Sequence, residues 1–387
     1  MRNHRTEPHS RGYTNVRVAI DYRPALRQPT GIGWYIRWLL DAMIARHPDI
    51  EWYVFSSSYR DRLHLPWSAP NVHPVDRRWS VRLLDYLWTY WHWPAFENFL
   101  PGPVDLVHVP YPQIVPLRSG TPIVATIHDL WLFHTDRPEL QKARSVFERH
   151  VQWIIHHAHL ILVPTYHIAS QIVAHHPEVA DRLRVIPHGC PPDVAPDRVP
   201  DVRDDPRFAQ LPERYILFVG ALNARKDPGT AVAVIDRLRW EGLSLPLVIV
   251  GDGPLRATLL RRIRVRQLPV YILGYVDRRY LPALYSRARL LLVTSQDEGF
   301  GFPILEAMAM GVPVVARRVP VLTEIAGPAA VFVEDHGLDG WVTAVHQVWT
   351  DDALHARLQC LGRERVRFFR WETTAEQTWT AYREVLE

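Results

Sequence analysis

Residues 290–313 read LLLVTSQDEGFGFPILEAMAMGVP and describe a turn from a strand into a helix. The apolar run Leu290–Val293 predicts a buried strand, and Pro303 suits the first position of the following helix. Gly311 and Pro313 then close that helix. The helix therefore starts at the carboxyl end of a strand. Free backbone amides and the positive end of the helix dipole form a site for an anion there.

Two carboxylates flank this turn. Glu298 lies on the loop and Glu306 is expected in the first turn of the helix, so both can face one ligand. Gly299 and Gly301 let the backbone approach that ligand closely. A sugar or a ribose offers hydroxyl groups, which donate hydrogen bonds to carboxylates. The alternative is that Glu306 only caps the helix dipole and that Glu298 is solvated.

Outward from this turn, strands alternate with helices in both directions. The expected strands are Val16–Asp21, Trp52–Ser56, Leu106–Val109, Ile123–Ile127, Leu160–Pro164, Leu183–Ile186, Tyr215–Val219, Leu247–Val250, Val270–Leu273, Leu290–Val293 and Val314–Ala316. The expected helices are Trp34–Arg46, Ser145–His159, Gly229–Glu241, Leu255–Gln267, Leu281–Arg287 and Pro303–Met310. This alternation predicts an α/β protein with parallel sheets that are covered on both faces.

A stretch rich in Pro and Asp, from Cys190 to Pro212, interrupts the alternation and has the composition of a linker. We therefore expect one Rossmann-like domain over residues 1–195, a linker over 196–212 and a second such domain over 213–369. The long helix 370–387 is expected to cross back to the first domain. Ligands should bind at the carboxyl ends of the strands, in the cleft between the domains.

The composition of the chain excludes several classes of protein. The length of 387 residues suggests two domains, and a hydrophobic content of 47% indicates a folded protein. The net charge of +4 with mixed signs would allow nucleic-acid binding, but a phosphate-bearing substrate, an anionic membrane surface or a generally solvated surface explains it equally well. We expect no nucleic-acid partner. Cys190 and Cys360 lie far apart and fit a reducing cytosol. The polar N-terminus and the absence of a long apolar run predict no signal peptide and no transmembrane helix. Lysine occurs only at Lys142 and Lys226.

The spacing Glu298-x7-Glu306, with Gly-Phe-Gly-Phe-Pro between, resembles the E-x7-E motif of the retaining glycosyltransferase family 4, whose fold is GT-B. Five further segments resemble that family in the same order, so the likeness spans nearly the whole chain. They are Asp21–Leu40, Thr126–Leu130, Val185–Gly189, Phe218–Lys226 and Trp371–Ala375. The resemblance implies a nucleotide-sugar donor on the C-terminal domain and an acceptor on the N-terminal domain.

The resemblance also implies roles for individual residues of the donor site. Lys226 and Arg225 would hold the donor diphosphate, Glu306 the ribose and Glu298 the transferred sugar. The motif residues Gly299, Phe300, Gly301 and Phe302 would line the donor, and Gly31 and Gly33 would approach the diphosphate from the other domain. Many family members place the arginine several residues before the lysine. Here the two are adjacent, so the role of Arg225 stays open.

His128 would contact the donor sugar near the reacting carbon, so His128 and Glu298 are the catalytic candidates. The alternatives are that His128 is one structural histidine among twenty and that Lys226 is an exposed turn lysine. Asp129 is expected to be structural. The chain contains no Asp-x-Asp pair, so we expect no metal and no other cofactor. The charge on the departing diphosphate would then be stabilised by cationic side chains and helix amides.

The resemblance implies a retaining hexosyltransferase of polysaccharide biosynthesis that acts on a glycan or lipid-linked glycan acceptor. Within the family the chain looks most like bacterial mannosyltransferases, which favours GDP-mannose as the donor. A UDP-sugar is the alternative donor. A nucleotide-sugar epimerase and a non-catalytic nucleotide-sugar-binding protein are less favoured. A phosphorylase would need a pyridoxal-phosphate lysine, which makes it improbable in a chain with two lysines.

The segment 77–99 combines basic residues with tryptophans, including Arg78, Trp88, Trp91 and Trp93. Such a mixture suits the membrane interface, where it would hold the protein peripherally at the inner face of the membrane, or stacking against an acceptor sugar. The alternative is a buried aromatic helix.

Overall fold

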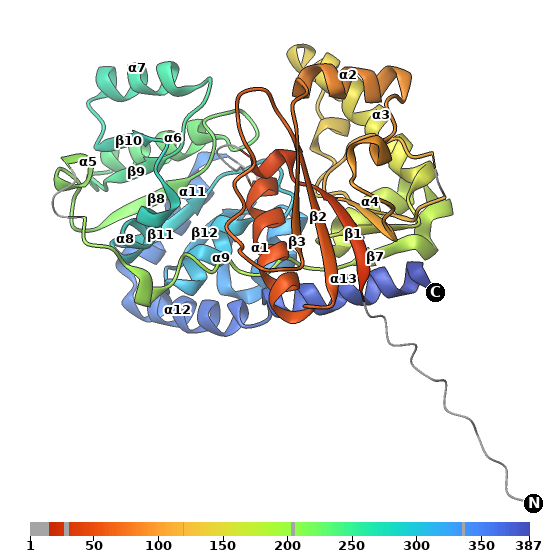
Figure 1. The fold of residues 1–387 in the computed structure, drawn as a ribbon. Helices are drawn as coiled ribbons and strands as arrows, with labels where there is room; N and C mark the ends of the chain where they lie inside the picture. The colour runs from red at the N-terminus through yellow and green to blue at the C-terminus, as the bar shows by residue number, and fades with distance from the viewer. Residues whose placement is uncertain (1–14, 27–30, 119, 203–205, 335–336) are drawn as a thin grey trace, which may run out of the picture.

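The computed structural model describes residues 15–26, 31–118, 120–202, 206–334 and 337–387. This part of the chain forms two parallel sheets with helices on both faces (Figure 1). The first sheet has the strand order β3-β2-β1-β4-β5-β6-β7, and the second has the order β10-β9-β8-β11-β12-β13. The predicted α/β architecture with two Rossmann-like domains is confirmed.

The first domain contains seven strands within the described residues. They are β1 (Val16–Asp21), β2 (Ile50–Ser57), β3 (Val72–Arg77), β4 (Leu106–Val109), β5 (Ile123–Thr126), β6 (Leu160–Val163) and β7 (Leu183–Val185). Its helices are α1 (Gly31–Arg46), α2 (Val81–Trp91), α3 (Gln141–His157) and α4 (Tyr166–His175), and the short 3-10 turn η1 covers Arg23–Ala25.

The second domain repeats the pattern. Its strands are β8 (Tyr215–Val219), β9 (Leu247–Val250), β10 (Val270–Gly274), β11 (Ala288–Val293), β12 (Val314–Arg317) and β13 (Ala330–Val333). Its helices are α5 (Pro206–Ala209), α6 (Pro228–Trp240), α7 (Arg256–Arg266), α8 (Leu281–Ser286), α9 (Phe302–Ala309), α10 (Pro320–Ala326), α11 (Leu338–Thr350) and α12 (Asp352–Val366), and the 3-10 turn η7 covers Arg278–Tyr280.

Most predicted strands match the structure within one or two residues, because each is a short apolar run that is buried between helix layers. The exception among the strands of the first sheet is β3, which was not predicted. It contains Pro74 and exposed positions, as an edge strand can. A second difference concerns the expected glycine turn: α1 already begins at Gly31, so Gly31 and Gly33 lie in its first turn. Thr30 lies outside the described residues.

The C-terminal helix α13 (Trp371–Leu386) leaves the second domain and packs along α1 of the first, as predicted (Figure 1). Trp371, Ala375 and Tyr382 are buried in the core that the first sheet shares with α1. The Tyr382 hydroxyl also lies 2.7 Å from Nδ1 of His108 on β4. A side chain at position 189 would collide with Trp371, so Gly189 lets the start of α13 pass closely over the end of the first domain.

The two sheets share one topological feature that positions ligands. In each sheet the chain runs outward from a central strand on one side and then returns to continue on the other side. The reversal lies between β1 and β4 in the first sheet and between β8 and β11 in the second. We call each of these places a switch point. In open parallel sheets the loops at the carboxyl ends of these two strands separate and form a crevice for a ligand.

None of the helices in the described ranges combines the length and the apolar character that a membrane crossing requires.

Candidate active site

The switch point of the second sheet brings two predicted donor residues together. Lys226 lies in the loop after β8, and Glu298 lies in the loop after β11. The Lys226 ammonium donates a hydrogen bond to Oε1 of Glu298 at 2.5 Å. The Lys226 side chain is 20% exposed, whereas the Glu298 side chain is 7% exposed. Neither the exposed turn lysine nor the solvated glutamate of the alternative interpretations is therefore present.

Neighbouring residues hold the Lys226 loop in place. The Thr294 hydroxyl donates to the backbone carbonyls of Lys226 at 3.0 Å and Asp227 at 2.7 Å. The Asp227 carboxylate accepts from the Thr230 amide at the start of α6 and pairs with Arg317 at 2.9 Å. The position of the Lys226 ammonium is thus set by both loops of the switch point rather than by its own chain segment alone.

Glu298 is ionised in this setting. Burial acts to raise the pKa of its carboxyl, but the positive charges of Lys226 and Arg225 outweigh burial and lower the pKa below its ordinary value. The result is a buried carboxylate beside an ammonium group that still reaches solvent. Such an ammonium can exchange its carboxylate partner for a phosphate without a large rearrangement.

Arg225 faces the other domain. Its guanidinium pairs with the Asp129 carboxylate at 3.1 Å, and its Nε donates to the Asp297 carbonyl at 3.1 Å. The guanidinium also lies 5.5 Å from the ring centre of Trp131. Asp129 and Trp131 belong to the loop after β5, so Arg225 links the two domains beside Lys226. Asp129 was expected to be structural, and the structure gives it this interdomain ion pair.

His128 has both ring nitrogens engaged. Its Nε2 donates to the Pro110 carbonyl at 2.8 Å, which leaves Nδ1 to accept from Nε2 of His188 at 3.2 Å. Burial lowers the pKa of His128 more than the Pro110 carbonyl and Asp129 raise it. The imidazole is therefore neutral, and it is held at the carboxyl end of β5 facing the second domain.

The glycines of the motif are explained by close approach at this interface. A Cβ at position 299 would lie 2.6 Å from the backbone oxygen of His128, so Gly299 lets the two domains meet at the site. Gly301 has a φ of 97°, which favours glycine, and it forms the N-cap of α9. Phe300 is buried against His188, and Phe302 packs edge-on against Trp38 of α1 at 5.4 Å. Both phenyl rings thus pack between the domains.

Glu306 corrects a prediction. It lies in the second turn of α9, not the first, and its side chain is 1% exposed. Its Oε1 accepts from Arg278 at 2.7 Å and its Oε2 from the Tyr285 hydroxyl at 2.8 Å. The alternative of a helix-capping carboxylate is therefore wrong. A ribose hydroxyl at Glu306 would have to share the carboxylate with these two side chains.

Arg278 was not anticipated from the sequence. It belongs to η7 and donates two hydrogen bonds to Asp193, at 2.7 and 2.9 Å, in addition to the one to Glu306. Its guanidinium also lies over Trp34 and Trp38 of α1, at 5.2 and 4.9 Å from the ring centres. One arginine therefore connects the glutamate of the motif with Asp193, just before the predicted linker, and with α1 of the first domain.

Gly31 marks where the two helix starts converge. A Cβ at position 31 would lie 4.0 Å from the Phe302 ring, so the first turn of α1 faces the first turn of α9 across the domain boundary. Gly33 lies in the same turn of α1 and is buried. The starts of two helices thus lie close together, where the free amides of both could act on one anion.

The tryptophan-rich segment divides into two parts. Trp88 is 0% exposed and its indole donates to the Pro94 carbonyl at 2.9 Å, so the prediction that Trp88 belongs to an acceptor or membrane surface is wrong. The reason is the helical period of α2, which turns Leu84 and Trp88 into the core. Arg78, Trp91 and Trp93 are exposed, as that prediction requires.

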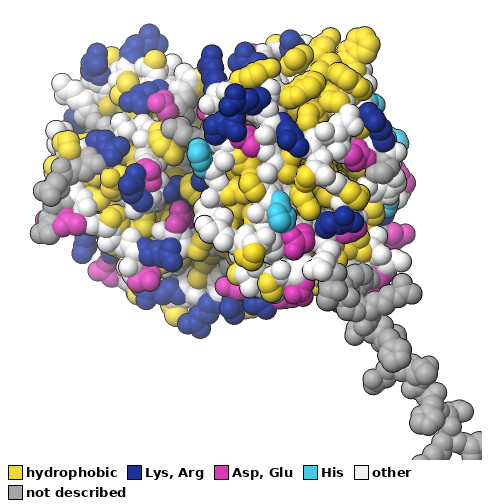
Figure 2. Space-filling model, viewed as in Figure 1, with side chains coloured by type: hydrophobic (Ala, Val, Ile, Leu, Met, Phe, Trp, Pro, Cys, Tyr) yellow, Lys and Arg dark blue, Asp and Glu magenta, His cyan; other side chains and the backbone are white. Residues whose placement is uncertain are grey.

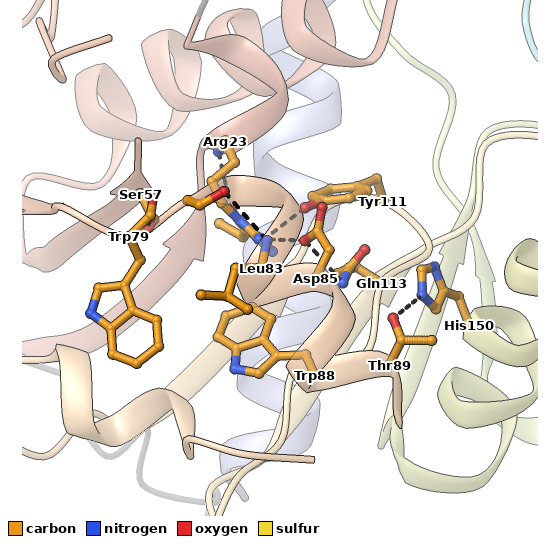
Figure 3. A network of polar contacts seen from close by, with 12 residues as sticks. Arg23, Ser57, Trp79, Leu83, Asp85, Trp88, Thr89, Tyr111, Gln113 and His150 are labelled. Carbon is orange, nitrogen blue, oxygen red and sulfur yellow. Dashed lines mark hydrogen bonds and ion pairs between the residues drawn. The ribbon is translucent and has the colours of Figure 1, made fainter. Parts of the chain in front are cut away.

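A second polar cluster, at the switch point of the first sheet, was also missed (Figure 3). It consists of Asp21, Arg23, Asp85, Tyr111 and Gln113. The only signal in the sequence is that Asp21 ends a predicted strand and Tyr111 shortly follows one. Among the described residues no group of three or more His, Cys, Asp or Glu side chains is placed to hold a metal ion.

Two family models match this chain. The family model described as "Glycosyltransferase Family 4" matches residues 13–194, and the model described as "Glycosyl transferases group 1" matches residues 203–365. The chain is 27% identical to the O-antigen chain mannosyltransferase B of Escherichia coli over 317 residues, which are 81% of this chain and 78% of that protein. It is 30% identical to the D-inositol 3-phosphate glycosyltransferase of Salinispora tropica over 74% of this chain and 65% of that protein.

Among solved structures, sucrose-phosphate synthase from Thermosynechococcus elongatus superposes with a TM-score of 0.73 at 22% identity. The superposition covers 96% of this chain and 99% of that one. At this identity the likeness establishes the two-domain fold.

Proposed function

This chain belongs to the glycosyltransferase family 4, and we propose that it transfers a hexose, with mannose favoured, from a nucleoside diphosphate sugar, with GDP-mannose favoured, to a glycan or lipid-linked glycan. The observation that carries the proposal is the contact between Lys226 and Glu298 at the switch point, directly beside the interdomain contact of Gly299 with His128. The likeness to a mannosyltransferase supports the choice of mannose. UDP-sugars are the alternative donors.

In this proposal the Lys226 ammonium leaves Glu298 and binds the donor diphosphate. The bond from the sugar carbon to the phosphate oxygen breaks during transfer, and the new negative charge develops on that oxygen. Lys226 and the amides at the starts of α1 and α9 stabilise this charge because they are already oriented toward it. No metal ion is required for the charge balance.

Glu298, once released from Lys226, accepts hydrogen bonds from hydroxyls of the transferred sugar. Glu306 holds the ribose, which requires its buried carboxylate to turn from Arg278 or Tyr285 toward the donor. Neutral His128 lines the sugar from the other domain. We propose retention by attack on the same face: the acceptor oxygen bonds the sugar carbon as the phosphate leaves, and the acceptor proton passes to that phosphate. A trapped covalent sugar–enzyme adduct would contradict this route.

The experiment is a screen of GDP- and UDP-sugars, with GDP-mannose included, by thermal shift and by hydrolysis of the donor. We expect at least one nucleotide sugar to raise the melting temperature and to be hydrolysed slowly without acceptor. Glu298→Ala should abolish this hydrolysis. Asp136→Ala, which changes an exposed carboxylate in the first domain, serves as the control. If no nucleotide or nucleotide sugar stabilises the protein, the proposal fails.

We also propose that the protein acts in the cytoplasm, in peripheral contact with the inner face of the membrane, through the outer side of α2. Hydrophobic side chains gather over this helix, with Lys and Arg side chains beside them (Figure 2). Tyr86, Tyr90, Trp91 and Trp93 are each at least 50% exposed, and Arg78 and Arg82 are also exposed. Aromatic rings beside cationic groups suit the interface of an anionic lipid bilayer.

Liposome flotation tests the membrane contact. Trp91→Ala with Trp93→Ala should reduce recovery with vesicles that contain anionic lipid. Trp240→Ala is the matched control, because Trp240 is 75% exposed on the second domain. Equal recovery of both variants would remove the membrane proposal and leave the donor proposal intact.

A further inference from the structure

The loop that follows β4 organises the switch point of the first sheet (Figure 3). Its four consecutive residues each bond a different partner. The pairs are Pro110 with His128, Tyr111 with Asp21, Pro112 with His150 and Gln113 with Asp85. His128 faces the donor site of the second domain, so this short loop connects that site directly to the polar cluster.

Arg23 is the centre of the cluster, and its guanidinium is paired with carboxylates of the protein itself. Its guanidinium binds both carboxylate oxygens of Asp21, at 2.9 and 2.6 Å, and donates to Oδ1 of Asp85 at 2.7 Å. It also lies over the ring of buried Trp88 at 4.7 Å. The Arg23 and Asp21 side chains are 3% and 1% exposed, so neither of them can meet a ligand in this arrangement.

Of the three charged residues of the cluster, Asp85 is the one that reaches solvent, because its side chain is 40% exposed. Its Oδ1 accepts from Arg23 and, at 3.4 Å, from Gln113. Its Oδ2 has no partner among the described residues. Burial raises the pKa of this carboxyl more than the charge of Arg23 lowers it, so the carboxylate gains from any further hydrogen-bond donor.

The charges of the cluster do not cancel. Asp21 and Asp85 carry two negative charges against one positive charge on Arg23. A phosphate beside Asp85 would add negative charge where an excess already exists, and its oxygens can only accept hydrogen bonds when fully ionised. A sugar hydroxyl is uncharged and can donate to Oδ2 of Asp85.

The surface next to the cluster has room for a ligand. His150, which is bonded to Pro112 and to Thr89 of α2 at 3.0 Å, also lines a shallow hollow of about 510 Å³ on α3. The other residues that line this hollow are Glu139, Lys142, Ala143, Val146 and Phe147. Phe147 offers an aromatic surface beside His150, and burial lowers the pKa of His150 to about 4, so its ring is neutral.

We propose that Asp85, at the switch point of the first sheet, contacts the acceptor and selects one that presents an uncharged hydroxyl there rather than a phosphate. The acceptor hydroxyl donates to Oδ2 of Asp85, and the rest of the acceptor extends toward the hollow beside His150. This inference rests on the proposed function, because it concerns the second substrate of the same transfer.

The test compares wild type with Asp85→Asn, using the nucleotide sugar identified in the donor screen. Donor hydrolysis without acceptor is measured first. Transfer is then measured to methyl α-D-mannopyranoside and myo-inositol and to a monophosphate of each. We expect donor hydrolysis by Asp85→Asn to stay within twofold of the wild-type rate. The acceptor KM should rise roughly 10- to 100-fold, because a charge-assisted hydrogen bond to the acceptor is lost. Wild type should use the neutral compounds at least tenfold better than the phosphates, and Asp85→Asn should narrow that preference.

Asp105→Asn is the matched control. Asp105 is also 40% exposed and paired with an arginine, Arg17, but it lies at the amino end of β4, away from the switch point. Asp85→Glu keeps the negative charge and should therefore keep the preference for neutral acceptors. If Asp85 were only structural, the longer side chain would have no reason to preserve that preference.

The inference is overturned if Asp85→Asn leaves the acceptor KM within twofold, if Asp105→Asn raises it equally, or if wild type uses none of the neutral compounds or prefers the phosphates. A wild-type protein that hydrolyses no nucleotide sugar refutes the proposed function instead, before any acceptor is added. Melting temperatures of all three variants in the presence of donor show whether the fold is retained.

Discussion

The two switch points have the same topology, but the ion-pair partner that reaches solvent carries the opposite charge in each. In the second sheet the cation is the more exposed partner, with Lys226 at 20% and Glu298 at 7%. In the first sheet the carboxylate is exposed, with Asp85 at 40% and Arg23 at 3%. In each ion pair, the partner that reaches solvent is the one that can contact a ligand. The other partner stays buried, because a buried charge without an opposite charge beside it is strongly unfavourable. One switch point therefore suits phosphate and the other suits hydroxyl groups.

The largest effect should come from the buried cation of the first sheet. Arg23→Met would leave Asp21 without its partner and should lower the free energy of unfolding by about 3–5 kcal/mol. Urea unfolding measures this loss. Arg17→Met removes a cation that is 39% exposed and should cost about 1 kcal/mol or less. Equal losses in the two variants would show that the Arg23 cluster is not the structural centre inferred from its burial.

The exposed cation of the second sheet should matter for turnover instead. Lys226→Ala removes the group assigned to the leaving phosphate and should reduce kcat with donor by roughly 100- to 1,000-fold. The free energy of unfolding should also fall, because the buried Glu298 carboxylate loses its ammonium partner. Arg264→Ala removes an exposed cation on α7 of the second domain and should leave kcat unaltered. If kcat falls by less than fivefold in Lys226→Ala, Lys226 does not stabilise the leaving phosphate as proposed.

Acid should weaken the first domain before the second. Burial lowers the pKa of His108 to about 3 and that of His150 to about 4, and both residues belong to the first domain. Because the unfolded chain takes up these protons at about pH 6.5, stability is complete above that value and falls as the pH decreases. Between pH 6.5 and its pKa in the folded protein, each histidine should lower the free energy of unfolding by about 1.4 kcal/mol per pH unit. Hydrogen exchange measured at pH 7 and at pH 5 should show that β4 and α3 lose more protection on acidification than β8 and α9 do. A greater loss around β8 and α9 would contradict the prediction.

The smallest effect concerns the contact between the two regions. Asp129→Ala breaks the part-exposed pair with Arg225 and should change stability by about 1 kcal/mol or less and the donor KM by less than about fivefold. If the donor KM instead changes by a hundredfold, the interdomain pair sets the donor site more strongly than Lys226 and Glu298 do. Isothermal titration with the nucleoside diphosphate provides an independent measurement.

The order of strands and helices could be read from the sequence because it depends on neighbouring residues. Short apolar runs predicted β1, β4, β8 and β9 to the residue, since a strand buried on both faces needs no alternation. The strand–loop–helix turn at Glu298 was recognised for the same reason. The later helices α10 to α12 were missed.

The helix start at Gly31 was misplaced, because glycine favours a turn locally even where tertiary contacts continue a helix.

The partners of the polar residues could not be read in the same way. Trp88 and Trp91 are three residues apart on α2, yet one is buried and the other is 69% exposed, since only the packed helix decides which face meets the core. Arg278 meets Glu306, Asp193 and two tryptophans of another domain, and no spacing in the sequence relates these residues.

The sequence by itself determined the alternating α/β pattern, the family likeness and the residues of the donor motif, because these depend on residue types within short segments. Only the tertiary structure decided that Lys226 meets Glu298, that Arg225 reaches Asp129 and that Asp85 stands exposed above a buried arginine. The physical reason is that sheet order brings together the ends of strands that are distant in the chain. The burial that follows then determines which charge of each pair remains available to a ligand.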